Sequence, residues 1–422
     1  MNMGRGLLWA GVAVVFGAGF VARPAQEPIK PWVVIVGGST DGYLSPCGCT
    51  KPMSGGIRRR ATATRASGEP DRTLVLDGGN LVAGVGRQDE IKAETVAESL
   101  RSIGVDALNL TASDARLGSS MVGSIVRLSG SRVVSASIEG VDGIRRSIVK
   151  GPFVVTGISP GSEDIVRRLG GRSLTRDAAL AAFLDEAKVL DRTPILLWDG
   201  DRIGAEALAK AHPSLALIVY RSGSKVPATP FRVGETWLVT PGEKSKAIVR
   251  LEFSGGKWSQ YRAVALGPEF EDDAQVGAMF KTYLSRVGEE RLLEKLPRAP
   301  SAAFAGSKRC GSCHPAAYKV WKESRHADAL STLEKGGQDR DPDCVGCHVV
   351  GLELDRGFRS RSETPQLSDV GCESCHGPGA AHSAGPTKAP MPQVGAASCR
   401  SCHVPDHSPG FDYESYWKKI AH

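Results

Sequence analysis

The stretch Val370-Gly371-Cys372-Glu373-Ser374-Cys375-His376-Gly377-Pro378-Gly379 decides the architecture of the C-terminal part of the chain, because it contains the pattern Cys-x-x-Cys-His. The same pattern occurs three more times, in Cys310-Gly311-Ser312-Cys313-His314, Cys344-Val345-Gly346-Cys347-His348 and Cys399-Arg400-Ser401-Cys402-His403. Two thiols spaced by two residues can form thioethers with the vinyl groups of one haem, and the next histidine can bind its iron. The four motifs therefore predict four covalently bound haem c groups.

The motifs use eight of the ten cysteines in the chain. The predicted attachment residues are Cys310, Cys313, Cys344, Cys347, Cys372, Cys375, Cys399 and Cys402, and the predicted proximal iron ligands are His314, His348, His376 and His403. Disulfides or paired zinc knuckles are the alternatives for such cysteines. Neither explains why a histidine follows every second cysteine, so we favour haem attachment.

Four further histidines in this region match the number of distal ligands that four haems can take: His326, His382, His407 and His422. His326 lies in a stretch of good helix formers without Gly or Pro, so we expect it on a helix after the first motif. His382 follows a glycine-rich segment, where the backbone can approach a haem edge closely. Residues 306–422 are too few to enclose four haems in a conventional core, so the haems themselves should form it.

Haems bound by two histidines have no open position for a substrate, so the sequence predicts an electron carrier. An open distal position on one haem would instead allow an oxidoreductase that acts on a small nitrogen or sulfur species. The pattern of the four motifs, with Tyr318, Trp321 and His326 after the first and Val349-Val350-Gly351 after the second, resembles the tetrahaem cytochromes c related to the ammonia-oxidiser electron carrier. The resemblance implies redox partner proteins, including quinone-linked carriers, and one five-coordinate haem. One distal candidate is then not a ligand, and His422 is the first we would omit.

Between residues 31 and 255 the sequence predicts an α/β domain. Short apolar runs alternate there with helical stretches, at 32–36, 73–76, 91–103, 107–110, 153–158, 178–190, 195–198, 203–211, 215–219, 237–240 and 247–253. Three stretches, at 42–49, 55–60 and 74–80, resemble the calcineurin-like and nucleotidase-type metallophosphoesterases. The predicted fold is therefore a metallophosphoesterase-like α/β sandwich followed by a mostly helical or irregular multihaem cytochrome c domain.

The metal ligands that this second resemblance implies are missing. The positions of the family's Asp-x-His, Gly-Asp, Gly-Asn-His and Gly-His-x-His motifs read Ser39-Thr40-Asp41, Gly79-Asn80, Leu108-Asn109-Leu110-Thr111 and Tyr220-Arg221-Ser222-Gly223-Ser224. A two-metal hydrolase needs imidazole and carboxylate ligands to activate water. His212 is the single histidine before residue 310, so phosphoesterase activity is not expected.

The remaining segments concern export and linkage. Residues 1–27 have a basic start, an uncharged apolar stretch and a polar end. This pattern predicts a secretory signal or an N-terminal membrane anchor, and a location in the periplasm or on the outer face of the membrane.

Cys47-Gly48-Cys49 could form a disulfide or a thiol pair that binds a soft metal. Residues 272–305 predict a helix and a linker. The net charge of +7 comes without a long basic run, so nucleic acid is not an expected partner.

Overall fold

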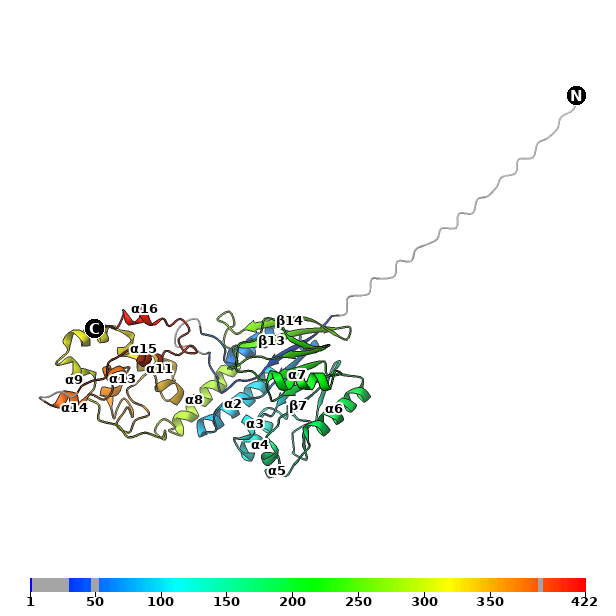
Figure 1. Ribbon diagram of the computed structural model, residues 1–422, viewed down its shortest axis with the longest axis horizontal. Helices are drawn as coiled ribbons and strands as arrows, with labels where there is room; N and C mark the ends of the chain where they lie inside the picture. The colour runs from blue at the N-terminus through cyan, green and yellow to red at the C-terminus, as the bar shows by residue number, and fades with distance from the viewer. Residues whose placement is uncertain (2–29, 47–52, 386–389) are drawn as a thin grey trace.

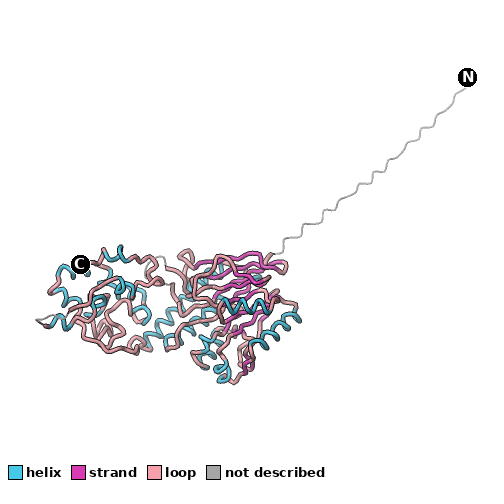
Figure 2. The backbone as a smooth tube through the Cα atoms, viewed as in Figure 1, coloured by secondary structure: helices cyan, strands magenta, loops and turns pink. Residues whose placement is uncertain are grey.

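The computed structural model describes residues 1, 30–46, 53–385 and 390–422. The strands occupy one half of the molecule, whereas helices and loops make up the other half (Figure 2). Apart from Met1, the predicted export segment lies outside the described residues, and so do Cys47 and Cys49. None of the described helices combines the length and apolar composition needed to cross a membrane.

Two six-stranded sheets form the N-terminal part. The first has the order β14-β13-β1-β2-β3-β4, in which β1 to β4 are parallel and the β13–β14 hairpin adds antiparallel strands. Its strands are β1 (Trp32–Gly37), β2 (Thr73–Asp77), β3 (Ala107–Asn109), β4 (Val133–Val134), β13 (Ala247–Ser254) and β14 (Lys257–Ala265). The second has the order β11-β12-β10-β9-β7-β6, with four parallel central strands between two antiparallel edges. Its strands are β6 (Ile148–Lys150), β7 (Phe153–Ile158), β9 (Thr193–Trp198), β10 (Leu217–Tyr220), β11 (Phe231–Val233) and β12 (Thr236–Val239).

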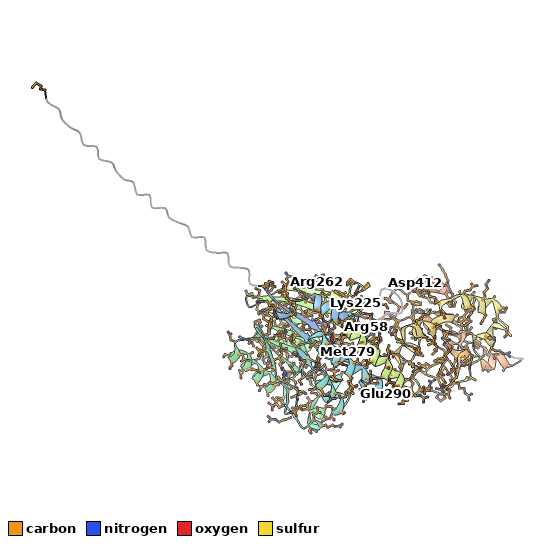
Figure 3. The ribbon with its side chains drawn as sticks, turned by 180° about the vertical axis from the view of Figure 1, so that it is seen from behind. Arg58, Lys225, Arg262, Met279, Glu290 and Asp412 are labelled. Carbon is orange, nitrogen blue, oxygen red and sulfur yellow. The ribbon has the colours of Figure 1, made fainter. Side chains whose placement is uncertain are left out.

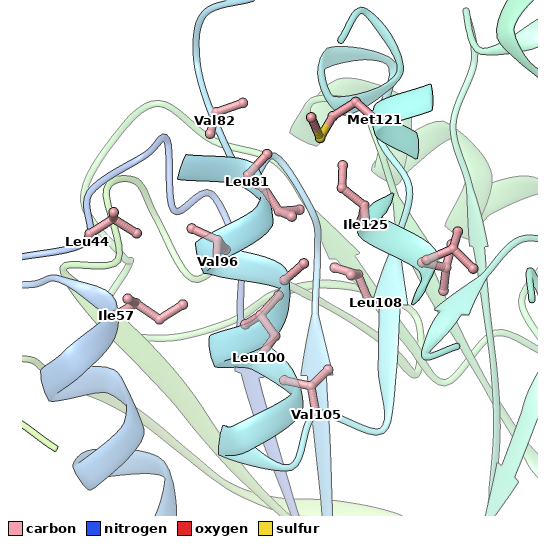
Figure 4. Close-up of a cluster of buried hydrophobic side chains, with 14 of the residues drawn as sticks. Leu44, Ile57, Leu81, Val82, Val96, Leu100, Val105, Leu108, Met121 and Ile125 are labelled. Carbon is pink, nitrogen blue, oxygen red and sulfur yellow. The ribbon is translucent and has the colours of Figure 1, made fainter. Parts of the chain in front are cut away.

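The two sheets pack face to face, and helices cover both outer faces. Alternate side chains of the facing strands, such as Val34, Leu76 and Val155, are buried between the sheets. Helices on the first sheet enclose a second core, which Figure 4 shows around α2, with Val96 and Leu100 beside Leu108 and Ile125. The covering helices are α1 (Ile57–Ala66), α2 (Arg87–Ile103), α4 (Ser119–Leu128) and α8 (Ala274–Glu289) on the first sheet, and α6 (Arg176–Leu190) and α7 (Arg202–Ala211) on the second. The predicted α/β sandwich is confirmed as four layers.

Two elements extend this part beyond residue 255, where the sequence placed its end. Strand β14 pairs with β13 along its whole length, from Ala247 opposite Ala265 to Ser254 opposite Lys257. The helix predicted within residues 272–305 is α8, and its side chains Val276, Phe280 and Tyr283 are buried in the same core as α2. Helix α8 is therefore part of the sandwich, and it also lies next to the C-terminal part (Figure 1).

The C-terminal part consists of short helices joined by long loops. They are α9 (Ser307–Gly311), α10 (Pro315–Glu323), η2 (Arg325–Asp328), α11 (Ala329–Gly336), α12 (Pro342–Val345), η3 (Pro365–Leu367), α13 (Cys372–His376), α14 (Ala380–Ala384), α15 (Ala396–Arg400) and α16 (Tyr413–Trp417). A small apolar cluster that includes Leu330, Val345 and Phe358 surrounds the second motif. By contrast, α10, α14, α15 and α16 bury no side chain. These helices therefore gain little stability from protein core alone.

Candidate functional site

Each Cys-x-x-Cys-His motif begins in a short helix. Cys310, Cys344, Cys372 and Cys399 lie in α9, α12, α13 and α15. One helical turn places the two cysteines of a motif on the same side, because residues three apart in a helix are neighbours. The turn closes onto the histidine: the backbone N–H of His314 donates to Cys310 at 2.9 Å, and that of His403 donates to Cys399 at 2.9 Å. None of the eight cysteines forms a disulfide.

Three of the four motif histidines face a second histidine from elsewhere in the chain. The ring centroids of His314 and His382 lie 6.2 Å apart, those of His326 and His403 lie 6.2 Å apart, and those of His376 and His422 lie 6.0 Å apart. His326 lies on η2, directly after the helix α10 on which it was expected, and His382 lies on α14. Each pair therefore joins a motif to a different segment of the module.

The spacing of these pairs fits one iron between two imidazoles. A metal–nitrogen bond to histidine is about 2 Å long, so two rings bound on opposite faces of one haem have centroids about 6 Å apart. Burial lowers the pKa of His326, His376 and His403, which favours the neutral ring that binds metals. The residues present thus fit haem groups with two axial histidines at three of the four motifs.

The second motif differs from the other three. His348 Nδ1 is 2.8 Å from the carbonyl oxygen of Ala329, a contact that orients the ring with Nε2 available to a metal. No other histidine ring faces His348 within the described residues, which include all nine histidines of the chain. Among the described residues the ring of His407 does not pair with that of another histidine. The structure thus brings His422, but not His407, next to a motif histidine.

Thiol contacts between motifs give the order of the four sites. The Cys310 side chain of the first motif lies next to Cys372 of the third, and the Cys402 side chain of the fourth lies next to Cys347 of the second. Cys375 of the third motif interacts electrostatically with the thiols of the fourth. The four sites therefore follow one another as first, third, fourth and second.

A buried polar network joins the second motif to the N-terminal part. Asp341, which precedes this motif, accepts hydrogen bonds from Gln88 at 2.8 Å and from the hydroxyl group of Tyr283 at 3.1 Å. Burial raises the pKa of Asp341 to about 6. Burial and the neighbouring Asp341 raise the pKa of Tyr283, so its hydroxyl group stays protonated and can donate the hydrogen bond. Lys92 forms an ion pair with Asp343. Burial alone would lower the pKa of Lys92, but Asp343 raises it above its ordinary value. Helices α2 and α8 thus hold the segment that carries Cys344.

A second contact ties the fourth motif to the sandwich. Asp406, three residues after His403, forms ion pairs with both Lys244 and Lys246. Burial raises the pKa of Asp406, but hydrogen bonds from the two lysines outweigh it and lower the pKa to about 2. The backbone N–H of Lys244 also donates to Asp41 at 3.1 Å. The fourth motif therefore lies next to the edge where β1 ends.

That edge is formed by the carboxyl ends of parallel strands, where ligands bind in open α/β sheets. Here Asp41 accepts a hydrogen bond from the Asn80 side chain, and burial raises its pKa. Arg60 Nη2 lies 2.6 Å from Asp77 Oδ2, with both side chains 1% exposed. Asn109 accepts from Ser159 Oγ at 3.2 Å. Among the described residues, no three His, Cys, Asp or Glu side chains come together as a metal site.

Several residues of these contacts had no role in the prediction from sequence. Asp341, Asp343 and Asp406 all lie within six residues of a motif. Acidic residues so close to a motif were the one sequence signal that could have predicted their contacts. Their partners Lys92, Tyr283 and Lys244 lie far away in the sequence. Glu373, inside the third motif, had no predicted function. It is buried and accepts backbone hydrogen bonds from Ala305 at 2.8 Å, Gly306 at 2.7 Å and Gly379 at 2.6 Å.

Comparison with known proteins supports the C-terminal assignment. Residues 309–377 match the family described as cytochrome c554 and c-prime. A curated relative, cytochrome c-554 of Nitrosomonas europaea, is 43% identical over 96 residues, and the alignment covers 19% of this chain and 41% of the relative. The chain thus spans less than half the length of this relative. These matches show that the C-terminal region is similar to c-type cytochromes, which bind haem covalently.

Solved structures support the assignment of the N-terminal fold. A sulfate thiohydrolase SoxB from Thermus thermophilus aligns with a TM-score of 0.51 at 17% identity, covering 70% of this chain and 69% of that one. The NAD nucleotidase of Haemophilus influenzae aligns with a TM-score of 0.52 at 12% identity, covering 66% and 64%. A 5'-nucleotidase precursor, also from Thermus thermophilus, aligns with a TM-score of 0.52 at 16% identity, covering 73% and 68%.

At these identities the likeness to the solved structures shows the fold alone. The chain therefore joins a C-terminal region that is similar to cytochrome c554 to an N-terminal domain with the same fold as the 5'-nucleotidase and SoxB structures.

Proposed function

We propose that this protein is an exported tetrahaem cytochrome c that carries electrons between redox proteins, and that its N-terminal domain positions the haems. The observation that carries the proposal is the spacing of 6.0–6.2 Å in the three histidine pairs. The proximal ligands would be His314, His348, His376 and His403, and the distal ligands of the first, third and fourth haems would be His382, His422 and His326. Haem c, when bound, would supply an iron that takes up and releases one electron.

The order of the sites supports a continuous electron path. Because the first motif contacts the third, and the fourth contacts the second, no site is isolated from the others. This chain's residues fix the spacing: Trp321 Nε1 donates to the carbonyl of Val370 at 2.8 Å, and the N–H of Val370 donates to the carbonyl of His326 at 3.1 Å. These bonds hold the distal ligand of the fourth haem against the third motif.

The positioning role of the N-terminal domain rests on its two attachments. Tyr283, Gln88 and Lys92 hold the segment before the second motif, while Lys244 and Lys246 hold Asp406 after the fourth. Both attachments lie at the same end of the path. We infer that a former catalytic edge now serves as a support for the haem module. The apolar segment at residues 1–27 supports export to the periplasm or to the outer face of the membrane, with or without cleavage.

A second function is favoured by the absence of a histidine ring opposite His348 in the described chain. A haem with one axial histidine keeps a position for a small nitrogen or sulfur species, so the second site could act as an oxidoreductase centre. Asp343 and Lys92 lie beside this site and would contribute charge near it.

Coulometric reduction of the purified protein tests the proposal. A tetrahaem carrier takes up four electrons per chain and returns them to an oxidant without loss. Uptake of fewer than four electrons by fully haem-loaded protein would contradict it. Turnover of nitrite, hydroxylamine or sulfite at a rate above that of the free haem peptide would favour the second function.

A further inference from the structure

The first motif lies at the free end of the electron path. In the order first, third, fourth and second, the last two sites face the N-terminal domain through Asp343 and Asp406. Helices α9 and α14 lie at the end of the module that is farthest from the β-sandwich (Figure 1). The first motif is therefore the site farthest from the N-terminal domain, at the end of the module that this domain leaves uncovered.

The surface around this site is basic. Between residues 308 and 325 the exposed cations are Lys308, Arg309, Lys319, Lys322 and Arg325, and Glu323 is the one acidic residue. Lys319 and Lys322 are three residues apart on α10, so they share one face of that helix.

The charges of this group are available to a partner. Within the described residues none of the five cations forms an ion pair; Arg309 donates to the carbonyl of Ser383 at 3.2 Å, and Lys322 lies over the ring of Trp321. Elsewhere in the module a surface cation such as Arg361 is paired, with Glu334 at 2.6 Å. Exposed cations without an ion-pair partner attract an oppositely charged surface and raise its rate of association.

We propose that α9 and α10 form the surface on which a redox protein with an acidic face docks, and that electrons enter or leave through the first haem. The inference rests on the proposed electron-carrier function and adds to it the place of exchange and the charge of the partner. Electrostatic attraction orients the encounter, and the position of the first motif at this end of the module keeps the distance for electron transfer short. The N-terminal domain covers the other end of the path, so it leaves this end free.

The experiment uses the full-length haem-loaded protein and a reduced flavodoxin, an acidic one-electron donor, as the probe. The charge-reversal variant Lys319→Glu/Lys322→Glu is compared with Lys188→Glu/Lys210→Glu, which makes the same change of net charge on exposed lysines of α6 and α7. At low ionic strength we expect the second-order reduction rate of the α10 variant to fall by about tenfold or more and its dependence on salt to become weaker. The control variant should stay within about twofold of the natural protein.

Equal rates for the two variants would overturn the docking surface, because net charge alone would then explain the effect. Full reduction by dithionite, haem content and visible spectra serve as the second readout. If both variants hold four reducible haems yet show equal rates with flavodoxin, the docking proposal fails and the carrier function stands. If the natural protein does not hold four reducible haems, the proposed function itself fails.

Discussion

The hydroxyl group of Tyr283, on a helix of the phosphoesterase-like domain, donates a hydrogen bond of 3.1 Å to Asp341, three residues before the second haem motif. Asp341 is 5% exposed and also accepts from Gln88. The same contact lies at the boundary between the two parts of the molecule, where Figure 3 shows Glu290 at the end of α8. The haem module is thus joined to the sandwich by buried polar groups rather than by a loose linker.

This relationship predicts a pH dependence. Burial raises the pKa of Asp341 from 3.8 to about 6, so the folded protein binds a proton that the unfolded chain releases between about pH 4 and 6. The free energy of unfolding should therefore fall as the pH rises through this range, by on the order of 3 kcal/mol above pH 6. Below about pH 4 both states are protonated, and the carboxyl group has no such effect.

The substitution Asp341→Asn tests this, because an amide can keep the contacts to Gln88 and Tyr283 without ionising, with its NH₂ group donating to the Tyr283 oxygen. Denaturant unfolding at pH 4.5 and pH 7 should show the variant more stable than the natural protein at pH 7 and little changed at pH 4.5. Asp185→Asn, at an exposed position of α6, is the control. If the free energy of unfolding of the Asp341→Asn variant depended on pH as it does in the natural protein, the raised pKa of Asp341 could not be its cause.

The histidine pairs predict which variants open a haem. Removing His422 should leave His376 as the single axial histidine of the third haem, so the ferrous His422→Ala protein should bind two equivalents of carbon monoxide. The natural protein should bind one equivalent, at the haem of His348. His407→Ala is the matched control and should also bind one. A His407→Ala protein that gains a carbon monoxide site, with His422→Ala unchanged, would reverse the ligand assignment.

The third prediction concerns the buried pair at the edge where β1 and β2 end. Arg60 and Asp77 are both 1% exposed, so Arg60→Met leaves a buried carboxylate without its partner and should lower the free energy of unfolding by about 3–5 kcal/mol. The exposed control Arg176→Met should change it by less than about 0.5 kcal/mol, measured by far-UV circular dichroism in urea. Equal losses in the two variants would show that the buried pair is not structural.

The same edge should not hydrolyse phosphate esters. Asp41 is paired with Asn80 and with the N–H of Lys244, and the imidazoles that a two-metal site needs are missing from the sequence of this domain apart from His212. We expect no hydrolysis of p-nitrophenyl phosphate or a nucleoside monophosphate above background with added Mn²⁺ or Zn²⁺. Metal-dependent hydrolysis that disappears in an Asp41→Ala variant would refute this expectation.

The last variant concerns the charge inside the third motif. The Glu373 carboxylate accepts three backbone hydrogen bonds and interacts electrostatically with Cys310, so it lies near the first and third motifs. A buried negative charge stabilises the oxidised iron, so Glu373→Gln should raise the reduction potential of a haem of this pair. The expected shift is on the order of 60 mV, a tenfold change in the one-electron equilibrium. Spectroelectrochemical titration measures it, with exposed Glu334→Gln as the control; a shift of equal size in both would count against a local effect.

The sequence predicted the parts of this protein that depend on local pattern. Cys-x-x-Cys-His is a local signal, and the alternation of apolar runs with helices predicted the sandwich that the sheets confirm. The export segment and the Cys47–Cys49 pair stay predictions, as they lie outside the described residues.

Contacts between distant residues could not be predicted in the same way. The pairing of His326 with His403, or of His376 with His422, depends on how the loops fold back, and spacing along the chain does not encode it. The same holds for the ion pair of Lys92 with Asp343. Strand β14 was not predicted because its residues are mostly exposed and polar and form no apolar run.

Haem count and spin state, measured on one sample, test the central claim most directly. A pyridine haemochrome assay combined with low-temperature electron paramagnetic resonance should give four haem c per chain, three of them low-spin with two histidines and one high-spin with His348 alone. Fewer than four haems, or four low-spin haems with no high-spin signal, would contradict the arrangement described here.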